Sequence, residues 1–228
     1  VTYSNNTNVG TATAKITFKG NYAGTVNKTF AIKKFAAPAV SRITKLENTA
    51  KGIIVTWTTS ANATSYEIYR SVNGGRFVKA DTLYIKGTGR QKTLGYADLK
   101  AKTNGGRYAY KIVAVRTLGN VTVRSAAGAA KTAYYVSVPS NIKLVNSTAR
   151  TIKVTYGRNA KAAGYEIRYS LKSNMAGAKV VKTKGASAAI AKLTKNKRYY
   201  ISVRSYKTVN KVTYYSAWST SKNIVVNK

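Results

Sequence analysis

Acidic side chains, which many hydrolytic enzymes use as general acids and bases, are rare in this chain of 228 residues. A glycosidase needs two carboxyl groups within about 5–10 Å of each other. Glu67 and Glu166 each stand in a Tyr-Glu-Ile tripeptide, at corresponding places of two similar segments, so we expect them to lie far apart. We predict that each forms a cross-strand ion pair with a base such as Lys111 or Arg204. The five acids are Glu47, Glu67, Asp81, Asp98 and Glu166.

Nucleophilic, metal-dependent and phosphate-binding chemistry also lacks the residues that it needs. No histidine and no cysteine occur, so a serine or lysine nucleophile has no obvious base, and no zinc-ligand spacing exists. The acids do not cluster in the sequence as a calcium site requires. Gly87-Thr88-Gly89-Arg90 lacks both the spacing of a phosphate-binding loop and the helix that follows one. The sequence therefore predicts a protein that is not an enzyme and has no cofactor and no metal.

Positive charge is the strongest feature of the composition. Forty lysines and arginines stand against the five acids and give a formal net charge of +35. A small domain needs a net charge of only about 2–8 for solubility, so solubility does not require this excess. Because one-sided charge destabilises a compact state by self-repulsion, we expect a polyanion or a negatively charged surface as the partner.

Basic and aromatic side chains alternate along one predicted strand, and this pattern suggests where an anion would bind. Arginine binds phosphate or sulfate through two parallel hydrogen bonds, and tyrosine rings can stack on sugars or bases. Long basic side chains also cover outer sheet faces without any ligand, so both interpretations remain open. The candidate polyanion-binding residues are Arg198, Tyr200, Arg204 and Tyr206, with Arg168 on a neighbouring strand, and a weaker first-copy set of Arg107, Lys111 and Arg116.

The chain contains an internal repeat. Residues 43–57 match residues 142–156, and Tyr66-Glu67-Ile68 matches Tyr165-Glu166-Ile167. Pro38 and Pro139 each precede the first strand of a copy. Two tandem domains therefore follow one N-terminal segment. We predict the boundaries 1–35, 36–136 and 137–228.

Hydrophobic residues within each copy recur at every second position, which is the signature of β-strands. Ile53, Val55 and Trp57 share one face of a strand, and Tyr66 and Ile68 share one face of the next. The inward sets of the later long strands are Tyr108, Tyr110, Ile112 and Ala114 in the first copy and Tyr199, Ile201, Val203 and Ser205 in the second. Turn sequences such as Asn73-Gly74-Gly75 separate the runs. About seven short strands per copy predict an all-β fold of two β-sandwiches.

Both copies resemble fibronectin type III modules of the kind found in bacterial surface proteins. Trp57 stands where such modules carry a tryptophan, although Tyr156 replaces it in the second copy. Tyr66–Ser71 followed by Asn73-Gly74-Gly75 is similar to their central hairpin, and Leu193 followed by Tyr199 has the tyrosine-corner spacing. The resemblance implies two tandem immunoglobulin-like sandwiches of Gram-positive-type bacterial origin. No Arg-Gly-Asp tripeptide points to integrin-type adhesion.

The first 35 residues differ from the two copies. Ala12, Ala14, Ile16 and Phe18 alternate in one run, and Val26, Phe30 and Ile32 alternate in a second. They resemble the closing hairpin of a bacterial immunoglobulin-like repeat, whose upstream half would be missing. Two strands cannot bury a core alone, so either the chain is a processed or truncated piece, as its start at Val1 suggests, or its open edges pair with another copy.

Charge and resemblance together predict a non-catalytic extracellular structural or adhesion module at the cell surface or in the cell wall. Its partners would be anionic cell-wall polymers or acidic glycans. No run of 18 apolar residues occurs, so no membrane span is predicted. The absence of cysteine fits a reducing compartment or export from a Gram-positive-type bacterium.

Three other functions remain open. The first is a self-assembling surface-layer, sheath or filament subunit, whose partners are copies of itself. The second is an extracellular protein that binds nucleic acid without sequence specificity and with a steep salt dependence, since no known nucleic-acid-binding motif occurs. The third is a spacer from a larger hydrolase.

Overall fold

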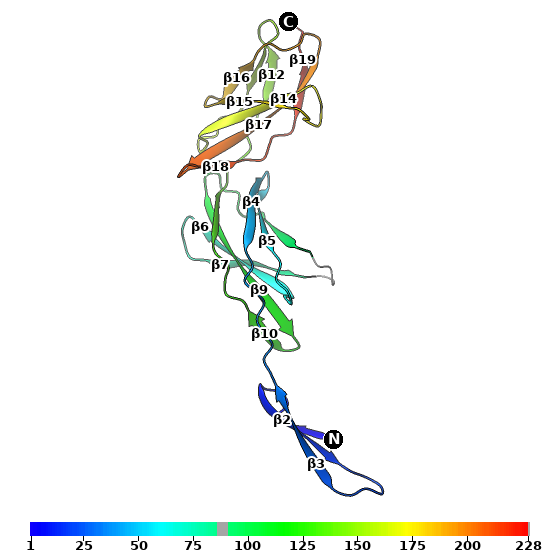
Figure 1. The fold of residues 1–228 in the computed structure, drawn as a ribbon. Helices are drawn as coiled ribbons and strands as arrows, with labels where there is room; N and C mark the ends of the chain where they lie inside the picture. Colours follow the sequence, from blue (N-terminus) through cyan, green and yellow to red (C-terminus); the bar gives the residue numbers. More distant parts are fainter. Residues whose placement is uncertain (86–90, 228) are drawn as a thin grey trace.

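A computed structural model describes residues 1–85 and 91–227, and all regular elements within them are β-strands. The segment Gly87-Thr88-Gly89-Arg90 lies outside the described residues. Figure 1 shows a small N-terminal sheet followed by two larger β-structured parts in a row, with the two chain ends at opposite ends of the molecule. The prediction of an all-β fold is confirmed.

The N-terminal sheet has three antiparallel strands in the order β1-β2-β3. The sequence predicted a two-stranded hairpin, and the difference is a short first strand that pairs Tyr3 with Ala14. Ala12 is buried, but most other apolar side chains of this sheet are exposed, because no second layer covers it. The strands are β1 (Thr2–Ser4), β2 (Gly10–Thr17) and β3 (Thr25–Ile32).

The first sandwich packs a three-stranded sheet, in the order β4-β5-β8, against a larger sheet in the order β10-β9-β6-β7. The strands are β4 (Ile43–Thr49), β5 (Gly52–Thr58), β6 (Ser65–Val72), β7 (Val78–Tyr84), β8 (Thr93–Asp98), β9 (Arg107–Leu118), β10 (Val121–Arg124) and β11 (Lys131–Tyr134). The second sandwich repeats this topology, with β12-β13-β16 facing β15-β14-β17-β18. Its strands are β12 (Lys143–Asn146), β13 (Ile152–Thr155), β14 (Gly164–Ser170), β15 (Lys179–Thr183), β16 (Ser187–Ile190), β17 (Arg198–Val209), β18 (Val212–Tyr215) and β19 (Lys222–Val225). The predicted boundaries at residues 35–36 and 136–137 fall between strands.

Within the described residues, each sandwich has eight strand segments rather than the predicted seven, because its last strand is divided. β10 and β11 both pair with β9, and β18 and β19 both pair with β17. At the division a serine hydroxyl, rather than a backbone carbonyl, accepts the hydrogen bond from the neighbouring strand. The amide of Ala114 donates to Ser125 Oγ, and that of Ser205 donates to Ser216 Oγ, each at 3.0 Å. The segment after each serine is therefore free to leave the regular ladder.

The alternating positions form the two cores as predicted. Trp57 and Tyr66 are fully buried with their rings 5.6 Å apart, and Tyr156 and Tyr165 form the equivalent pair at 4.7 Å. Tyr199 confirms the tyrosine-corner spacing, because its hydroxyl accepts a hydrogen bond of 3.1 Å from the Thr194 amide. The inward sets of β9 and β17 are also buried. Side chains at the remaining positions of these strands therefore lie on the outer faces.

The two sandwiches contact each other at a joint, which is stabilised by hydrogen bonds and by packed aromatic rings. Asn48 Nδ2 donates at 2.9 Å to the carbonyl oxygens of both Tyr134 and Tyr215, which belong to different sandwiches. The rings of Tyr134 and Tyr214 pack edge to face with centroids 5.2 Å apart. The joint therefore holds the outer surfaces of the two sandwiches in one relative orientation.

Candidate polyanion-binding face

The outer face of β14 and β17 carries the predicted arginines of the second sandwich. Arg204 and Arg168 are half-buried, whereas Arg198 is exposed. The antiparallel register places Glu166 directly opposite Arg204 and Arg168 opposite Ser202. The sheet therefore brings Arg168 and Arg204 together, as the sequence predicted, and leaves Arg198 at the end of β17.

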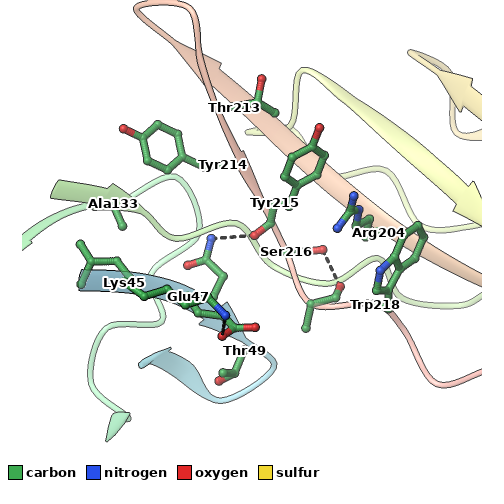
Figure 2. A pocket seen from close by; sticks show the side chains of 13 residues that line it. Lys45, Glu47, Thr49, Ala133, Arg204, Thr213, Tyr214, Tyr215, Ser216 and Trp218 are labelled. Atoms are coloured by element: carbon green, nitrogen blue, oxygen red, sulfur yellow. Dashed lines mark hydrogen bonds and ion pairs between the residues drawn. The ribbon is translucent and has the colours of Figure 1, made fainter. Parts of the chain in front are cut away.

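Arg204 is fixed on both sides by aromatic rings and from below by an acid. Its guanidinium carbon lies 3.9 Å from the ring centroid of Tyr215 and 4.4 Å from that of Trp218 (Figure 2). Two of its nitrogens donate to Glu166 Oε2 at 2.6 and 2.8 Å. The predicted Glu166–Arg204 ion pair is confirmed, and it occupies donors that an external phosphate would need.

Glu166 is neutralised twice, because Lys182 Nζ on β15 lies 3.1 Å from its other carboxylate oxygen. Burial raises the pKa of the Glu166 carboxyl, but the hydrogen bonds from Arg204 and Lys182 outweigh burial. The pKa therefore lies below its ordinary value, and the carboxylate stays ionised at neutral pH.

Arg168 has aromatic contact but no acidic partner in the part of the chain that the structure describes. Its guanidinium carbon lies 4.5 Å from the ring centroid of Trp218. Its buried Nε and the buried hydroxyl of Ser202 opposite it both lack a hydrogen-bond partner. Burial and then the charge of Arg204 lower the pKa of the Arg168 guanidinium. Unlike Arg204, Arg168 has no acidic partner among the described residues, so its guanidinium charge is available to pair with an external anion.

Tyr200, Tyr206 and Arg198 lie farther from Trp218 along β17 than Arg204 does, and Tyr206 and Arg198 contact other side chains. The Tyr206 ring lies 6.0 Å from that of Tyr215, and we call Trp218, Tyr215 and Tyr206 together the aromatic row. Tyr200 pairs in register with Ser170 and Asn223. Arg198 donates at 2.6 Å to the side-chain oxygen of Asn223.

The weaker first-copy set is spread out rather than gathered. Lys111 lies over the ring of Phe77 at 4.5 Å, and Arg116 lies over that of Phe35 at 4.6 Å. Arg107 begins β9, and its amide donates at 3.0 Å to the side chain of Asn73. These three cations are therefore at separate places along one strand.

The predicted ion pair between Glu67 and Lys111 is wrong. Glu67 accepts instead from Arg124 on β10, at 3.1 to 3.3 Å, with Lys79 on β7 at 3.9 Å. The hydrogen bond from Arg124 lowers the pKa of the Glu67 carboxyl despite the opposing effect of burial. The partners of Glu67 come from β10, which lies beside β9, and from β7, which lies beside β6. Lys111 contacts the ring of Phe77 instead.

Two important residues of this face escaped the sequence-based prediction. Trp218 and Tyr215 lie where the last strand is divided between β18 and β19. In this segment the hydroxyls of Ser216 and Ser219 accept hydrogen bonds from amides of β17. The only signal for them was the sequence Tyr215-Ser216-Ala217-Trp218-Ser219, which places two large rings three residues apart. That spacing does not follow strand alternation, and so it was not recognised.

A cleft of about 520 Å³ lies at the joint, beside the aromatic row (Figure 2). Its walls come from β4 of the first sandwich and from the segment Thr213–Trp218 of the second. Lys45 and Glu47 pair with each other at its edge. The third charged residue of the lining is Arg204, which pairs with Glu166, so each charged group of this cleft already has a partner in the chain.

Among the described residues there is no group of three or more acids that could hold a metal ion. Nor do these residues form a helix with the length and hydropathy that crossing a membrane requires. What the arrangement offers chemically is fixed positive charge with aromatic surface.

Comparison with known proteins gives structural similarity only. No protein-family model matches the chain, and no curated protein matches it. A structure of the chicken CNTN1 FN1–FN3 domains aligns with 17% identity and a TM-score of 0.41, over 96% of this chain and 78% of that one. A segment of two fibronectin type III domains from chicken tenascin aligns with 15% identity and a TM-score of 0.36, over 83% and 99% respectively.

Proposed function

We propose that this protein is a non-catalytic extracellular structural or adhesion module of a bacterial surface protein, which binds anionic cell-wall polymers or acidic glycans electrostatically. The observation that carries the proposal is the excess of forty bases over five acids. Charge of this size raises the local concentration of polyanions and steers them to the surface.

The acids that could neutralise this charge are already used within the chain. Glu47, Glu67, Asp98 and Glu166 each contact a basic residue of the same chain. Few carboxylates therefore remain to offset the other bases or to form ion pairs with neighbouring copies. The remaining positive charge is available to an external polyanion.

The mode of binding follows from how the arginines are held. Arg204 is committed to Glu166 and to two rings, so it contributes charge rather than a free guanidinium. Arg168, Arg198 and the exposed lysines remain as contacts for a flexible anionic chain. Binding of this kind has little stereospecificity, falls with salt, and extends over both sandwiches.

The N-terminal sheet favours a second candidate function, a self-assembling surface-layer, sheath or filament subunit. Tyr3 and Phe30 pack edge to face with ring centroids 6.3 Å apart, yet they are 59% and 43% exposed. A sheet with an uncovered apolar face and open edges can pair with another chain. Charge repulsion between copies opposes such assembly unless a polyanion is present.

Salt-dependent retention tests the proposal. The protein is loaded on immobilised heparin and on isolated Gram-positive cell walls at about 0.05 M NaCl and eluted toward about 1 M, a range over which the Debye length falls roughly fourfold. We expect elution from both within this range. A matched protein with its lysines succinylated should pass through unretained. Retention that does not change across the gradient contradicts the proposal.

A further inference from the structure

We propose that a cleft at the end of the second sandwich away from the joint is a specific binding site for one acidic sugar residue. The cleft has a volume of about 610 Å³ and is lined by the end of β14, the start of β15 and the segment between β16 and β17. It lies at the end of the sandwich opposite the joint, because β14 begins beside Tyr206 near the joint and ends at Ser170. It is therefore separate from the Arg168–Arg204 face.

Aromatic and aliphatic side chains form the floor of this cleft. Tyr169 and Tyr199 lie with ring centroids 6.3 Å apart and planes inclined at 50°. Leu193 is buried beside them in the second core. Pockets for small ligands combine such an apolar lining with a few placed polar groups. The C–H face of a sugar ring has the size and polarity to lie on this floor.

Lysines form the rim. Lys172, Lys179 and Lys192 all line the cleft, and no acidic residue lines it. None of these lysines takes part in the ion pairs found among the described residues. A ligand with a carboxylate or sulfate would therefore meet charge of one sign.

The corresponding position of the first sandwich holds charged and polar side chains. Arg70 occupies the place of Tyr169, and Asp98 occupies that of Ile190, as the strand registers show. Arg70 Nη1 donates to both oxygens of Asp98 at 2.8 and 2.9 Å, and the Tyr110 hydroxyl donates to the same carboxylate at 2.8 Å. A polar network thus fills this end of the first core, although Arg70 Nε has no hydrogen-bond partner in it.

At the corresponding positions the second sandwich has apolar and aromatic side chains in place of that network. Ile190 and Ile201 replace Asp98 and Tyr110, and no carboxylate is left to pair with the surrounding lysines. Three lysines without an acidic partner among the described residues lie beside one aromatic floor, so this cleft combines local positive charge with an apolar surface. This combination therefore points to an anionic ligand.

The edges of the cleft are held in place by the backbone. Lys192 has a φ of +59° and Gly177 a φ of +66°, both in the left-handed region. Glycine adopts this conformation easily and lysine does not. Ser170 Oγ donates at 2.9 Å to the Ala176 carbonyl, which fixes the loop between β14 and β15. A site held open in this way loses little entropy when a ligand binds.

The volume restricts the occupant to a small unit. Ligand pockets span about 300–1,000 Å³, so this cleft has room for a sugar residue and not for a folded partner. A uronic acid residue of a glycan supplies both the ring and the carboxylate. This inference rests on the proposed function only in taking the ligand from the class of anionic glycans.

The test is an amide NMR titration of the full chain with D-glucuronate, with D-glucose and acetate as matched probes. We expect saturable shifts confined to residues 170–179 and 191–194 with glucuronate. Glucose, which lacks the charge, and acetate, which lacks the ring, should bind more weakly by on the order of tenfold. Uniform shifts over the lysine-rich surface, or equal binding of acetate, overturn the proposal.

Two variants separate this cleft from general charge. Ala191→Trp fills the cleft from an exposed position without changing the charge, and it should abolish the glucuronate shifts while the spectrum stays dispersed. K179Q/K192Q should weaken glucuronate binding on the order of tenfold, whereas K143Q/K153Q, with the same loss of charge on β12 and β13, should not. Glucuronate binding that survives Ala191→Trp overturns the site.

The same variants keep the two proposals distinguishable. Ala191→Trp should leave salt-dependent retention on heparin unchanged, because retention depends on total charge. Salt-independent retention with intact glucuronate shifts contradicts the proposed function alone. Normal retention without glucuronate shifts contradicts the cleft alone.

Discussion

The guanidinium carbon of Arg204 lies 4.4 Å from the ring centroid of Trp218, although Arg204 belongs to the inner strand β17 and Trp218 to the segment between β18 and β19. Arg168 lies 4.5 Å from the same ring centroid. One indole ring therefore holds two like charges close together, and its interaction with both cations offsets part of their mutual repulsion. The aromatic row makes an outer sheet face of arginines compatible with a folded sandwich.

Trp218→Ala should destabilise the second sandwich through this arrangement. Each cation–π contact contributes about 0.5–2 kcal/mol, so we expect the free energy of unfolding to fall by about 1–4 kcal/mol. Urea denaturation followed by far-UV circular dichroism measures the change. Tyr22→Ala, at an exposed residue of the N-terminal segment, is the control and should have little effect. An unchanged unfolding midpoint for Trp218→Ala contradicts a structural role for the aromatic row.

Asp98→Ala should be the most damaging substitution of an acidic residue. Asp98 is 1% exposed and pairs with the guanidinium of Arg70, which would be left buried without a partner. Removing one member of a buried ion pair costs about 3–5 kcal/mol. Thermal unfolding of the full chain should show a large fall in the midpoint of the first sandwich.

The matched control for that prediction is Asp81→Ala. Asp81 is exposed and accepts a hydrogen bond only from the amide of the next residue, Thr82, among the bonds found in the described residues. Surface changes of this kind stay within about 0.5 kcal/mol. Equal effects of the two substitutions would show that the Arg70–Asp98 pair contributes nothing to stability.

Stability should decline in acid because of Glu67 and Glu166. Both carboxyl groups have a pKa below the ordinary value of 4.5 in the folded chain. Their contribution is therefore fully present above about pH 4.5 and is lost as the pH falls through the lower, folded-state pKa. Urea unfolding between pH 7 and pH 2 should show this decline, and E67Q/E166Q should have a flatter profile below pH 4.5.

Asn48→Ala should loosen the joint without unfolding either sandwich. The change removes the two hydrogen bonds of 2.9 Å that link the carbonyls of Tyr134 and Tyr215 through one side chain. Residual dipolar couplings should then report a wider range of relative orientations, while each sandwich keeps its own stability. Asn146→Ala is the control, because Asn146 Nδ2 bonds within one sandwich to Val225. An unaltered spread of orientations would mean that the other contacts, the Tyr134–Tyr214 rings and the hydrogen bonds between Asn104 and Asn159, hold the joint.

The fold was largely predictable because alternation determines which face of a strand a side chain lies on. Trp57, Tyr110 and Ile201 are all buried where the period of two placed them. The division of the last strand was not predictable in the same way. It depends on Ser125 and Ser216 reaching across to amides of β9 and β17, and a hydroxyl bonds as readily to water.

The candidate site was predictable only in part. The sequence placed Arg168, Arg204 and Glu166 on one face, and the sheet register confirms their proximity. It assigned Lys111 to Glu67, whereas Arg124 and Lys79 are the partners. The position of Trp218 on this face could not be predicted, because its segment lies between β18 and β19, outside the regular strand ladder.

Local order and composition specify the β-strands, the repeat, the inward residues and the large positive charge, so all four can be inferred from the sequence. The folded chain is needed to show which charges meet, which arginines are committed to acids and rings, and where a cleft with unpaired lysines remains. Ion pairs and cation–π contacts act over only a few ångströms. They depend on which strands become neighbours and in which register, and neither is encoded in the spacing of residues along a single strand.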